Sequence, residues 1–307
     1  MLIYNLSGVF THLLRDEGGI TIMAEKDQAC ASASSCSRES CEGCPSRGGA
    51  EGPQSFRVPQ NANSNIRHVI GVVSGKGGVG KSLVTASLAN ALAKSGARVG
   101  ILDADITGPS IPKMYGLTGP AEVISETQIL PGIAENGVKV MSLNLIMEDP
   151  EQAVIWRGPI IAGVVKQFWT DVVWGELDYL LVDMPPGTGD VPLTVFQSLP
   201  VDGIFIVTSP QDLVRMIVAK AVNMAKLMNV PVLGVIENYS FLKCPDCGRK
   251  IDVFGKSRIE EIAKEMGIAF AGQIPIEPGY AEMSDEGRFA DVDNGYIAQA
   301  MELLRGI

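Results

Sequence analysis

The sequence lacks the long apolar segment that a membrane-spanning helix requires. No apolar run in its 307 residues approaches the length of about 18 residues that such a helix needs. The first 23 residues contain apolar side chains but no basic region ahead of them, and Arg15, Asp16 and Glu17 stand where a signal peptide would continue. We therefore expect a cytoplasmic protein. Since Met23 opens a more polar stretch, translation from that residue is an alternative that the intact mass of the natural protein tests.

The sequence also lacks an excess of positive charge. It has 25 Lys and Arg against 35 Asp and Glu, a formal net charge of −10. Broad electrostatic binding to nucleic acids or anionic membranes needs a basic face, so we expect neither as a partner. Residues 293–307 carry Arg305 as their only basic residue, which leaves the C-terminus without the basic amphipathic helix that binds membrane surfaces.

Cysteine is absent from the long apolar middle of the chain. Four of the six cysteines lie in the first 44 residues and the other two form a late pair. Without an export signal, they are better explained as metal ligands or redox thiols than as a disulfide framework. They are Cys30, Cys36, Cys41, Cys44, Cys244 and Cys247.

The N-terminal segment is poor in large apolar residues. From about residue 24 to 65 it is rich in Ser, Ala, Gly, Asn and Glu, so it cannot bury enough apolar surface to offset the entropy of ordering it. We expect residues 1–65 to form a flexible arm ahead of a globular domain over 66–307. Cys41 and Cys44 have a spacing that lets two thiolates reach one metal, and Cys30 and Cys36 would complete four ligands of a second cluster; unligated cysteines are the alternative.

A glycine-rich loop follows the first apolar run of the domain. Residues 69–73 are typical of a strand, residues 83–96 of a helix, and GKGGVGKS lies between them. This is the P-loop pattern in its required context. Its glycines let backbone N–H groups surround a phosphate, while Lys81 would reach the β- and γ-phosphates and Ser82 would bind Mg²⁺. The predicted ATP-binding residues are Gly75, Lys76, Gly77, Gly78, Val79, Gly80, Lys81 and Ser82.

A second lysine, Lys76, follows the first glycine of this loop. A P-loop does not require it, so an ordinary exposed loop lysine is one explanation. The other is catalytic, because a second cation beside the phosphates would neutralise charge that develops during phosphoryl transfer.

Two predicted strands end in aspartate. The strand at 99–102 runs into Asp103 and Asp105, and the strand at 179–182 ends in Asp183 ahead of MPPGTGD. Carboxylates at the carboxyl ends of parallel strands lie where ligands bind in doubly wound sheets. We expect Asp183 to lie beside Mg²⁺, and Asp105 to orient a water molecule or join the magnesium shell. Asp103 is equally typical of a turn.

Strands and helices alternate over the rest of the domain. Further strands are expected at 138–145, 203–210 and 230–238, and helices after residue 158 and at 213–228. This alternation predicts an α/β fold with a doubly wound, mostly parallel sheet. Its core would include three large aromatic side chains, those of Phe168, Trp169 and Trp174.

The late cysteines, Cys244 and Cys247, have the spacing of a metal knuckle. Lys243, Arg249 and Lys250 are expected to lower the thiol pKa values and favour metal binding. One pair is half a site, so a second chain across a two-fold axis or the N-terminal arm would supply the other ligands. A redox disulfide or unligated thiols are the alternatives.

Taken together, these motifs resemble the Mrp/ApbC family of P-loop iron–sulfur cluster carriers, which are relatives of MinD, ParA and the nitrogenase iron protein. The resemblance covers about residues 66–290 and rests on GKGGVGKS, LDADITGPS, WRGP, LLVDMPPGTGD, IENYS, CPDC and GQIPIEP. It implies a homodimeric ATPase of the deviant Walker A type that uses ATP and Mg²⁺.

The resemblance also implies roles for individual residues. Lys76 would cross the dimer interface to the partner's nucleotide, Asp105 would be the switch I aspartate and Asp183 the Walker B aspartate, and Asn238 would recognise adenine. Cys244 and Cys247 would hold a [4Fe-4S] cluster between two subunits and pass it to apoproteins. Lys76, Lys81 and Asp105 are thus the expected catalytic residues.

Two other functions remain compatible with parts of the sequence. A positioning ATPase of the MinD/ParA kind would need the basic tail or patch that the C-terminus lacks. A regulatory NTPase stapled by zinc would use the same sulfur ligands. The N-terminal cysteines, with spacings of five, four and two residues, do not match the usual arm of the eukaryotic scaffold relatives.

Overall fold

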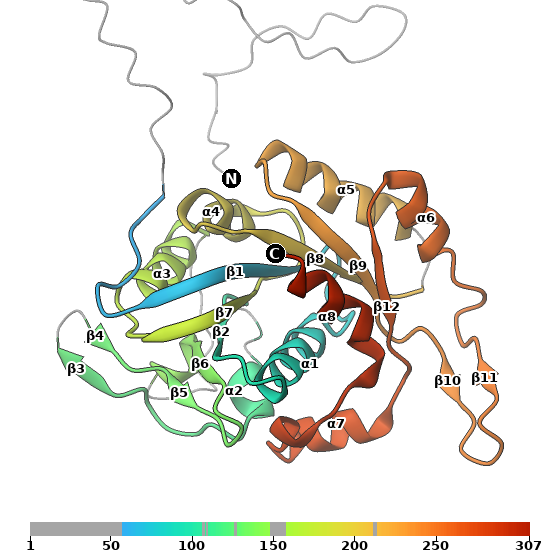
Figure 1. Ribbon diagram of the computed structural model, residues 1–307, viewed down its shortest axis with the longest axis horizontal. Coiled ribbons are helices and arrows are strands. Elements are labelled where there is room, and N and C mark those ends of the chain that lie inside the picture. Colours follow the sequence, from blue (N-terminus) through green and yellow to red (C-terminus); the bar gives the residue numbers. More distant parts are fainter. Residues whose placement is uncertain (1–56, 106–107, 109, 126–127, 148–157, 211–213) are drawn as a thin grey trace, which may run out of the picture. The chain divides into compact units, whose positions relative to one another are not determined.

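A mostly parallel sheet forms the centre of the molecule (Figure 1). The computed structural model describes residues 57–307 except 106–107, 109, 126–127, 148–157 and 211–213. Within that part, the strands of this sheet, in chain order, are β1 (Asn65–Ser74), β2 (Val99–Asp103), β5 (Gly132–Ile133), β6 (Lys139–Ser142), β7 (Glu176–Asp183), β8 (Gly203–Thr208), β9 (Val232–Glu237) and β12 (Phe270–Gln273).

The order across the sheet is β12-β9-β8-β1-β7-β2-β6-β5. Every neighbouring pair is parallel except the short edge strand β5, which runs antiparallel to β6. Non-consecutive strands are neighbours, so the chain crosses over the sheet repeatedly. The expected doubly wound α/β fold is confirmed.

Helices cover both faces of the sheet and enclose two apolar cores. Along β1, Val69 and Val73 face one core while Ile70 and Val72 face the other, the alternation expected of a strand buried on both sides. The first core packs under α3 (Gly158–Thr170), α4 (Asp190–Ser198), α5 (Val214–Leu227) and α6 (Ile259–Met266); the second packs under α1 (Lys81–Lys94), α2 (Ile111–Met114) and α8 (Ala298–Arg305). Of the described helices, none is both long and apolar enough to cross a membrane.

The remaining elements are short. Two small antiparallel ladders pair β3 (Val123–Ser125) with β4 (Gln128–Ile129), and β10 (Leu242–Lys243) with β11 (Lys250–Ile251). Helix α7 (Pro278–Asp285) has no buried residue. Three 3-10 turns, η2 (Leu143–Leu145), η3 (Phe289–Asp291) and η4 (Gly295–Ile297), complete the described part of the chain.

The strand predicted over 138–145 is shorter than expected. β6 ends at Ser142, and Leu143–Leu145 form the 3-10 turn η2. Leu143 packs in the first core and Leu145 in the second. Since residues two apart in a strand face the same side, the turn is what allows the two leucines to pack in different cores.

The three aromatic residues expected in the core are buried there. Phe168 and Trp174 are fully buried, and the Trp174 indole N–H donates to the carbonyl of Phe168 at 3.0 Å. Trp169 is also buried, and its indole N–H donates to the carbonyl of Val58 at 3.0 Å. The prediction for these side chains is confirmed.

The residues that precede β1 pack against the domain. The backbone N–H of Val58 donates to the carbonyl of Ser198 in α4 at 2.9 Å, and the Asn61 amide donates to the carbonyl of Thr170 at 2.9 Å. Asn61 and Ser64 are buried. The packed part of the chain therefore extends N-terminal to the boundary that the sequence predicts at residue 66.

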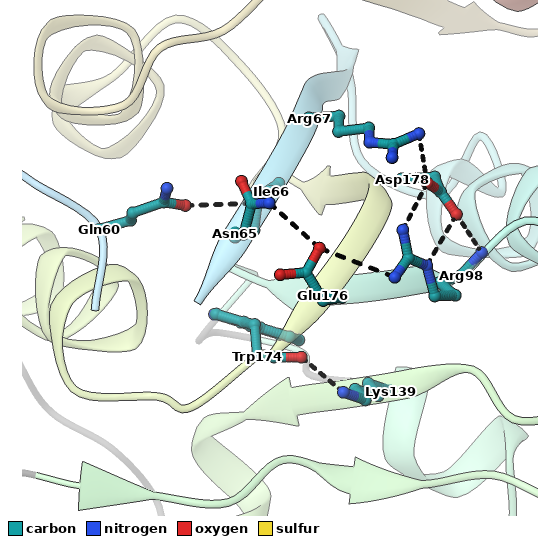
Figure 2. A network of polar contacts seen from close by, with 9 residues as sticks. All are labelled: Gln60, Asn65, Ile66, Arg67, Arg98, Lys139, Trp174, Glu176 and Asp178. Atoms are coloured by element: carbon teal, nitrogen blue, oxygen red, sulfur yellow. Dashed lines mark hydrogen bonds and ion pairs between the residues drawn. The ribbon is translucent and has the colours of Figure 1, made fainter. Parts of the chain in front are cut away.

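A polar network joins the amino ends of β1, β2 and β7 (Figure 2). Arg98 holds both carboxylate oxygens of Asp178, at 2.9 Å and 3.1 Å, and its backbone N–H donates to the same carboxylate at 2.9 Å. Arg67 lies 3.1 Å from that carboxylate, and Asn65 donates to Glu176 at 3.1 Å. These bonds hold the three strands in register at the end of the sheet opposite the glycine-rich loop.

Candidate nucleotide site and cysteine hairpin

Three central strands bring polar residues together at their carboxyl ends. β1 ends in Ser74, β2 in Asp103 and β7 in Asp183. The sheet register pairs Asp103 with Asp183, and Asp183 with Val72 of β1. The loop after β1 therefore begins beside both acidic strand ends, as the sequence predicts.

The glycine-rich loop needs its glycines for two physical reasons. Gly78 and Gly80 have φ values of 76° and 75°, in the left-handed region that side chains with Cβ atoms disfavour. A Cβ on Gly80 would also lie 2.1 Å from the Asn238 amide nitrogen. The loop can therefore pack directly on Asn238, the residue after the strand that ends at residue 237.

Lys81 lies at the centre of an acidic cluster. Its side chain is buried, and its Nζ lies 2.8 Å from Asp183 Oδ1 and 3.5 Å from Asp105 Oδ2. Burial lowers the pKa of Lys81, but the charges of Asp183, Asp105 and Asp103 outweigh that effect and raise it above its ordinary value. Lys81 is therefore a permanent cation at neutral pH.

Oxygen atoms of three side chains meet beside Lys81. Ser82 Oγ donates to Asp183 Oδ2 at 2.5 Å, and Thr85 Oγ1 lies 2.9 Å from Asp183 Oδ1. The Asp183 side chain has no exposed surface. A hydroxyl and a carboxylate held together are oxygen ligands of the kind that Mg²⁺ prefers, so Ser82 and Asp183 fit a Mg²⁺ ion bound together with phosphate oxygens.

Asp103 holds the start of the loop that carries Asp105. Its carboxylate is fully buried and accepts hydrogen bonds from the Asp105 backbone N–H and from Ser142 Oγ, both at 3.2 Å. Burial and the nearby charge of Asp183 raise the pKa of Asp103 well above its ordinary value. Asp103 is thus a structural anchor under the site: its bond to the Asp105 N–H is the turn contact that the sequence indicates, and its burial and its bond to Ser142 are added by the fold.

Asn238 joins the glycine-rich loop to the end of β9. Its Nδ2 donates to the carbonyl of Val79 at 3.0 Å. Its Oδ1 is buried and has no hydrogen-bond partner among the described residues. A buried acceptor without a donor is costly, so an amino group of a ligand would be stabilised there. This fits the base-recognition role that the family resemblance implies for Asn238.

The glycine-rich loop lines a cavity of about 460 Å³. Its walls include the loop residues 77–82, Asp105, and side chains of α2 and α7. Lys113 of α2 and Asp285 of α7 form an ion pair at 3.3 Å across one wall. Lys76 is exposed and Gly75 is partly exposed; neither lines this cavity, although both belong to the same loop.

Cys244 and Cys247 lie on the turn between β10 and β11. The Cys244 backbone N–H donates to the carbonyl of Arg249 at 2.9 Å, and the Gly248 N–H donates to the carbonyl of Cys244 at 2.8 Å. Cys244 is half-buried and Cys247 is exposed, and neither forms a disulfide. Backbone N–H groups, first that of Cys247 and then that of Asp246, lower the pKa of Cys244, which favours the metal-binding thiolate.

The cause of this pKa shift differs from the one expected. Lys243, Arg249 and Lys250 were expected to lower the thiol pKa values by their charge, but none of these charges is a cause of the shift at Cys244. The ammonium groups of both lysines lie over aromatic rings. The Lys250 Nζ is 3.8 Å from the ring centroid of Phe241, and the Lys243 Nζ is 4.9 Å from that of Tyr296. The backbone of the turn therefore lowers the pKa of Cys244, whereas the sequence predicts that the basic side chains do so.

The cysteine pair is an incomplete metal site within the described residues. No third Cys, His, Asp or Glu there forms a metal-binding group with it. The arm cysteines, Cys30, Cys36, Cys41 and Cys44, lie outside the residues that the structure describes.

Comparison with known proteins identifies the family. The model of the ParA family described as "NUBPL iron-transfer P-loop NTPase" matches residues 65–305. The chain belongs to this family. As a member, it has the P-loop NTPase architecture that its glycine-rich loop and acidic strand ends predict.

Two relatives of this family member carry the same name. The iron-sulfur cluster carrier protein of Methanocaldococcus jannaschii is 46% identical over 253 residues, which cover 80% of this chain and 87% of that protein. The iron-sulfur cluster carrier protein of Clostridium perfringens is 45% identical over 274 residues, which cover 87% of this chain and 94% of that protein.

Solved structures agree with the assignment. A nucleotide-binding protein of Archaeoglobus fulgidus, solved in complex with ADP, is 44% identical, has a TM-score of 0.66 and covers 74% of this chain and 88% of its own. MinD of Aquifex aeolicus, in its complex with MinC, has a TM-score of 0.57 at 23% identity and covers 78% and 96%. At that identity the likeness to MinD concerns the fold alone.

The structure adds Thr85 to this NTPase site and shows a buried carboxylate, that of Glu237, outside it. Thr85 lies one helical turn after Lys81 and contacts the carboxylate of Asp183, a spacing that a helix beginning at residue 81 makes predictable. Glu237 ends a buried strand, which is the same signal that drew attention to Asp183.

Proposed function

We propose that this chain is an ATP-dependent carrier of iron–sulfur clusters. Two copies hold a [4Fe-4S] cluster, as cargo, between their Cys244–Cys247 pairs and deliver it to apoproteins. The observation that carries the proposal is the accessible cysteine pair on a hairpin that begins four residues after Asn238, which contacts the glycine-rich loop through the carbonyl of Val79. The name of the relatives at 45–46% identity supports it.

In this proposal the nucleotide cavity binds ATP with Mg²⁺ and hydrolyses it slowly. Backbone N–H groups of residues 75–80 surround the phosphates, and Lys81 neutralises the charge of the β- and γ-phosphates. Ser82 and Asp183 hold Mg²⁺, which neutralises phosphate charge when bound, and Asp105 completes its shell or orients the attacking water. Lys76, exposed on the loop, contacts the nucleotide of the partner copy.

The cysteine pair makes the protein a homodimer in its cluster-loaded form. Two thiolates are half of the four-sulfur set that a [4Fe-4S] cluster uses. A second copy related by a two-fold axis presents the same pair. We assign the N-terminal residues to an arm and residues 58–307 to the ATPase domain, because Val58, Asn61 and Ser64 pack on that domain. The recipients are cytoplasmic apoproteins, and neither nucleic acid nor membrane is a partner.

Anaerobic reconstitution with iron and sulfide tests this proposal. We expect wild-type protein to hold about four irons per dimer in a brown, oxygen-sensitive chromophore, and the Cys244→Ala/Cys247→Ala variant to lose it. Iron, sulfide and zinc are quantified in both proteins, and transfer to an apo ferredoxin is followed by its absorption. A matched control replaces the arm cysteines by serine at positions 30, 36, 41 and 44.

Each result has a distinct meaning. Iron that remains in the Cys244/Cys247 variant and disappears from the arm variant would assign a cluster to the arm. Colourless protein that carries zinc would contradict the carrier proposal and indicate a zinc-stapled regulatory NTPase. Binding to vesicles or DNA would favour a positioning ATPase, which the net charge of −10 disfavours.

A further inference from the structure

Glu237 is a buried carboxylate that the nucleotide cavity does not use. It is the last residue of β9 and has no exposed surface. Its Oε2 accepts hydrogen bonds from Ser240 Oγ at 2.5 Å and from Gln273 Nε2 at 2.8 Å, and its Oε1 accepts one from Ser257 Oγ. All three donors are neutral, so hydrogen bonds alone compensate the burial of this carboxylate.

Two of these donors bracket the cysteine hairpin in the sequence. Ser240 precedes β10 by two residues, and Ser257 lies six residues after the end of β11. Both ends of the segment that carries Cys244 and Cys247 are therefore bound to one carboxylate. The backbone adds to this connection, because the Ser240 N–H donates to the carbonyl of Ile274 at 2.9 Å.

The residue that follows Glu237 contacts the glycine-rich loop. Asn238, the next residue, donates to the carbonyl of Val79 and packs against Gly80. Its own N–H donates to the carbonyl of Thr208 at the end of β8, at 2.8 Å. A shift of the loop at Val79 would act directly on the residue that follows Glu237.

A further contact leads from Glu237 toward the hairpin ladder. Gln273, which binds Glu237 through Nε2, accepts a hydrogen bond from Lys250 Nζ through Oε1 at 3.4 Å. Lys250 pairs with Lys243 in the β10–β11 ladder, and the next residue after Lys243 is Cys244. Side-chain contacts and neighbouring residues of the chain thus connect the glycine-rich loop with the cysteine turn.

We propose that Glu237 is a positioning residue that transmits the nucleotide state of the loop to the cysteine pair. Because it binds both ends of the hairpin segment and lies next to Asn238, the hairpin moves with the end of β9. This inference rests on the proposed function, because the coupling serves the release of a bound cluster. It concerns the metal-free protein, however, and can be tested without a cluster.

Cysteine alkylation in the metal-free, full-length protein tests the inference. The rates at which iodoacetamide modifies Cys244 and Cys247 are measured by peptide mass spectrometry with and without MgATP, for wild type, Glu237→Gln and Ser257→Ala. The Gln amide places an NH₂ where one donor needs an acceptor, and Ser257→Ala removes one bond while leaving the carboxylate intact. Glu302→Gln, at an exposed position of α8, is the matched control.

We expect nucleotide to change the wild-type and Glu302→Gln rates by about fivefold or more, and to change those of Glu237→Gln and Ser257→Ala by less than about twofold. ATP affinity, measured with a fluorescent analogue, stays within about twofold of wild type in all four proteins. A merely structural role would shift the melting temperature without removing the nucleotide effect. The inference would be overturned if nucleotide did not change the alkylation rates of wild type. It would also be overturned if nucleotide changed the rates of Glu237→Gln and Ser257→Ala as much as those of wild type.

This experiment and the reconstitution can fail independently. Wild-type alkylation rates that do not change with nucleotide, together with intact iron binding by wild type, would remove the role of Glu237 and leave the carrier function. Failure of wild type to bind iron would remove the carrier function and leave the coupling to be judged by alkylation. Ser257→Ala keeps the test decisive if Glu237→Gln does not fold.

Discussion

Lys81 has the clearest single-residue role in the site. Its buried Nζ lies between Asp183 and Asp105, where it would neutralise phosphate charge. We expect Lys81→Met to lower the rate of ATP hydrolysis by about 10²–10³-fold, measured by phosphate release. Since the change also leaves Asp183 buried without its cation, thermal stability should fall.

The control for this variant is Lys94→Met. Lys94 lies in the last turn of the same helix and pairs with Asp293 at the surface, so this change should leave hydrolysis unaffected. A folded Lys81→Met protein that hydrolyses ATP at the wild-type rate would contradict the catalytic assignment.

At the residue scale, the roles of motif residues can be predicted from the sequence, whereas roles that depend on tertiary packing cannot. Lys81, Ser82 and Asp183 meet as expected, because the P-loop and an acidic strand end have a fixed relation in this fold. Asp103 and Glu237 owe their roles to complete burial and, besides one donor within three residues of each, to donors distant in the sequence. Sequence spacing has no information about those donors, so these roles required the structure.

The loop between β1 and α1 allows a matched comparison of two glycines. Gly78 and Gly80 have nearly equal positive φ values, but a Cβ at Gly78 would meet nothing within 4 Å, whereas one at Gly80 would lie 2.1 Å from Asn238 Nδ2. We expect Gly78→Ala to cost about 1–2 kcal/mol through backbone strain alone. Gly80→Ala should cost about 3 kcal/mol or more, because strain and overlap add.

Urea unfolding of both variants measures this difference. The free energies of unfolding are compared at equal pH and salt and in the absence of nucleotide. Equal destabilisation by the two substitutions would mean that the contact between the loop and the end of β9 is looser than the structure has it.

The network at the amino ends of the strands predicts a pH dependence. The hydrogen bonds from the Arg98 side chain and backbone N–H, and the charge of Arg67, hold the pKa of Asp178 well below its ordinary value. A carboxylate whose folded pKa is depressed stabilises the fold above its unfolded pKa of about 3.9 and loses this contribution as the pH falls through the folded value.

Asp178→Asn should therefore be less stable than wild type at pH 7, and the difference should narrow below about pH 4. Both arginines are largely exposed, so salt should reduce the effect as well. Urea midpoints measured at several pH values and at low and high salt test this. A difference that stays constant down to pH 3 would mean that packing, and not charge, is responsible.

At the element scale, the long strands were predictable and the short ones were not. Apolar runs such as those of β1, β7 and β8 are buried on both faces, and this pattern is visible in sequence. β4, β5, β10 and β11 have two residues each, too few for any periodicity. Their positions depend on tertiary contacts such as the pairing of Lys243 with Lys250.

At the scale of the whole molecule, the two candidate sites share one structural element. The carboxyl end of β9 contacts the glycine-rich loop through Asn238 and holds the cysteine hairpin through Glu237. The fold class was predictable from the alternation of strands and helices, but this shared element was not, since it depends on side-chain contacts between segments far apart in the chain. It gives the proposed coupling a physical route within a single copy.

The proposed dimer predicts how iron binding depends on two copies. If each copy supplies half of the ligands, a mixed dimer of wild type and Cys244→Ala/Cys247→Ala has two of the four cysteines and should hold almost no iron. The wild-type dimer should hold about four irons. Two different affinity tags isolate the mixed dimer after co-expression and anaerobic reconstitution, and iron and sulfide are then measured per dimer.

The alternative arrangement gives a different count. If the arm of the same copy completed the site, the wild-type dimer would hold two clusters, or about eight irons, and the mixed dimer about four. Light scattering of each sample confirms that dimers are being compared. Because the described residues offer no third ligand to the cysteine pair, the iron content of the mixed dimer decides between a partner copy and the arm as the source of the missing thiolates.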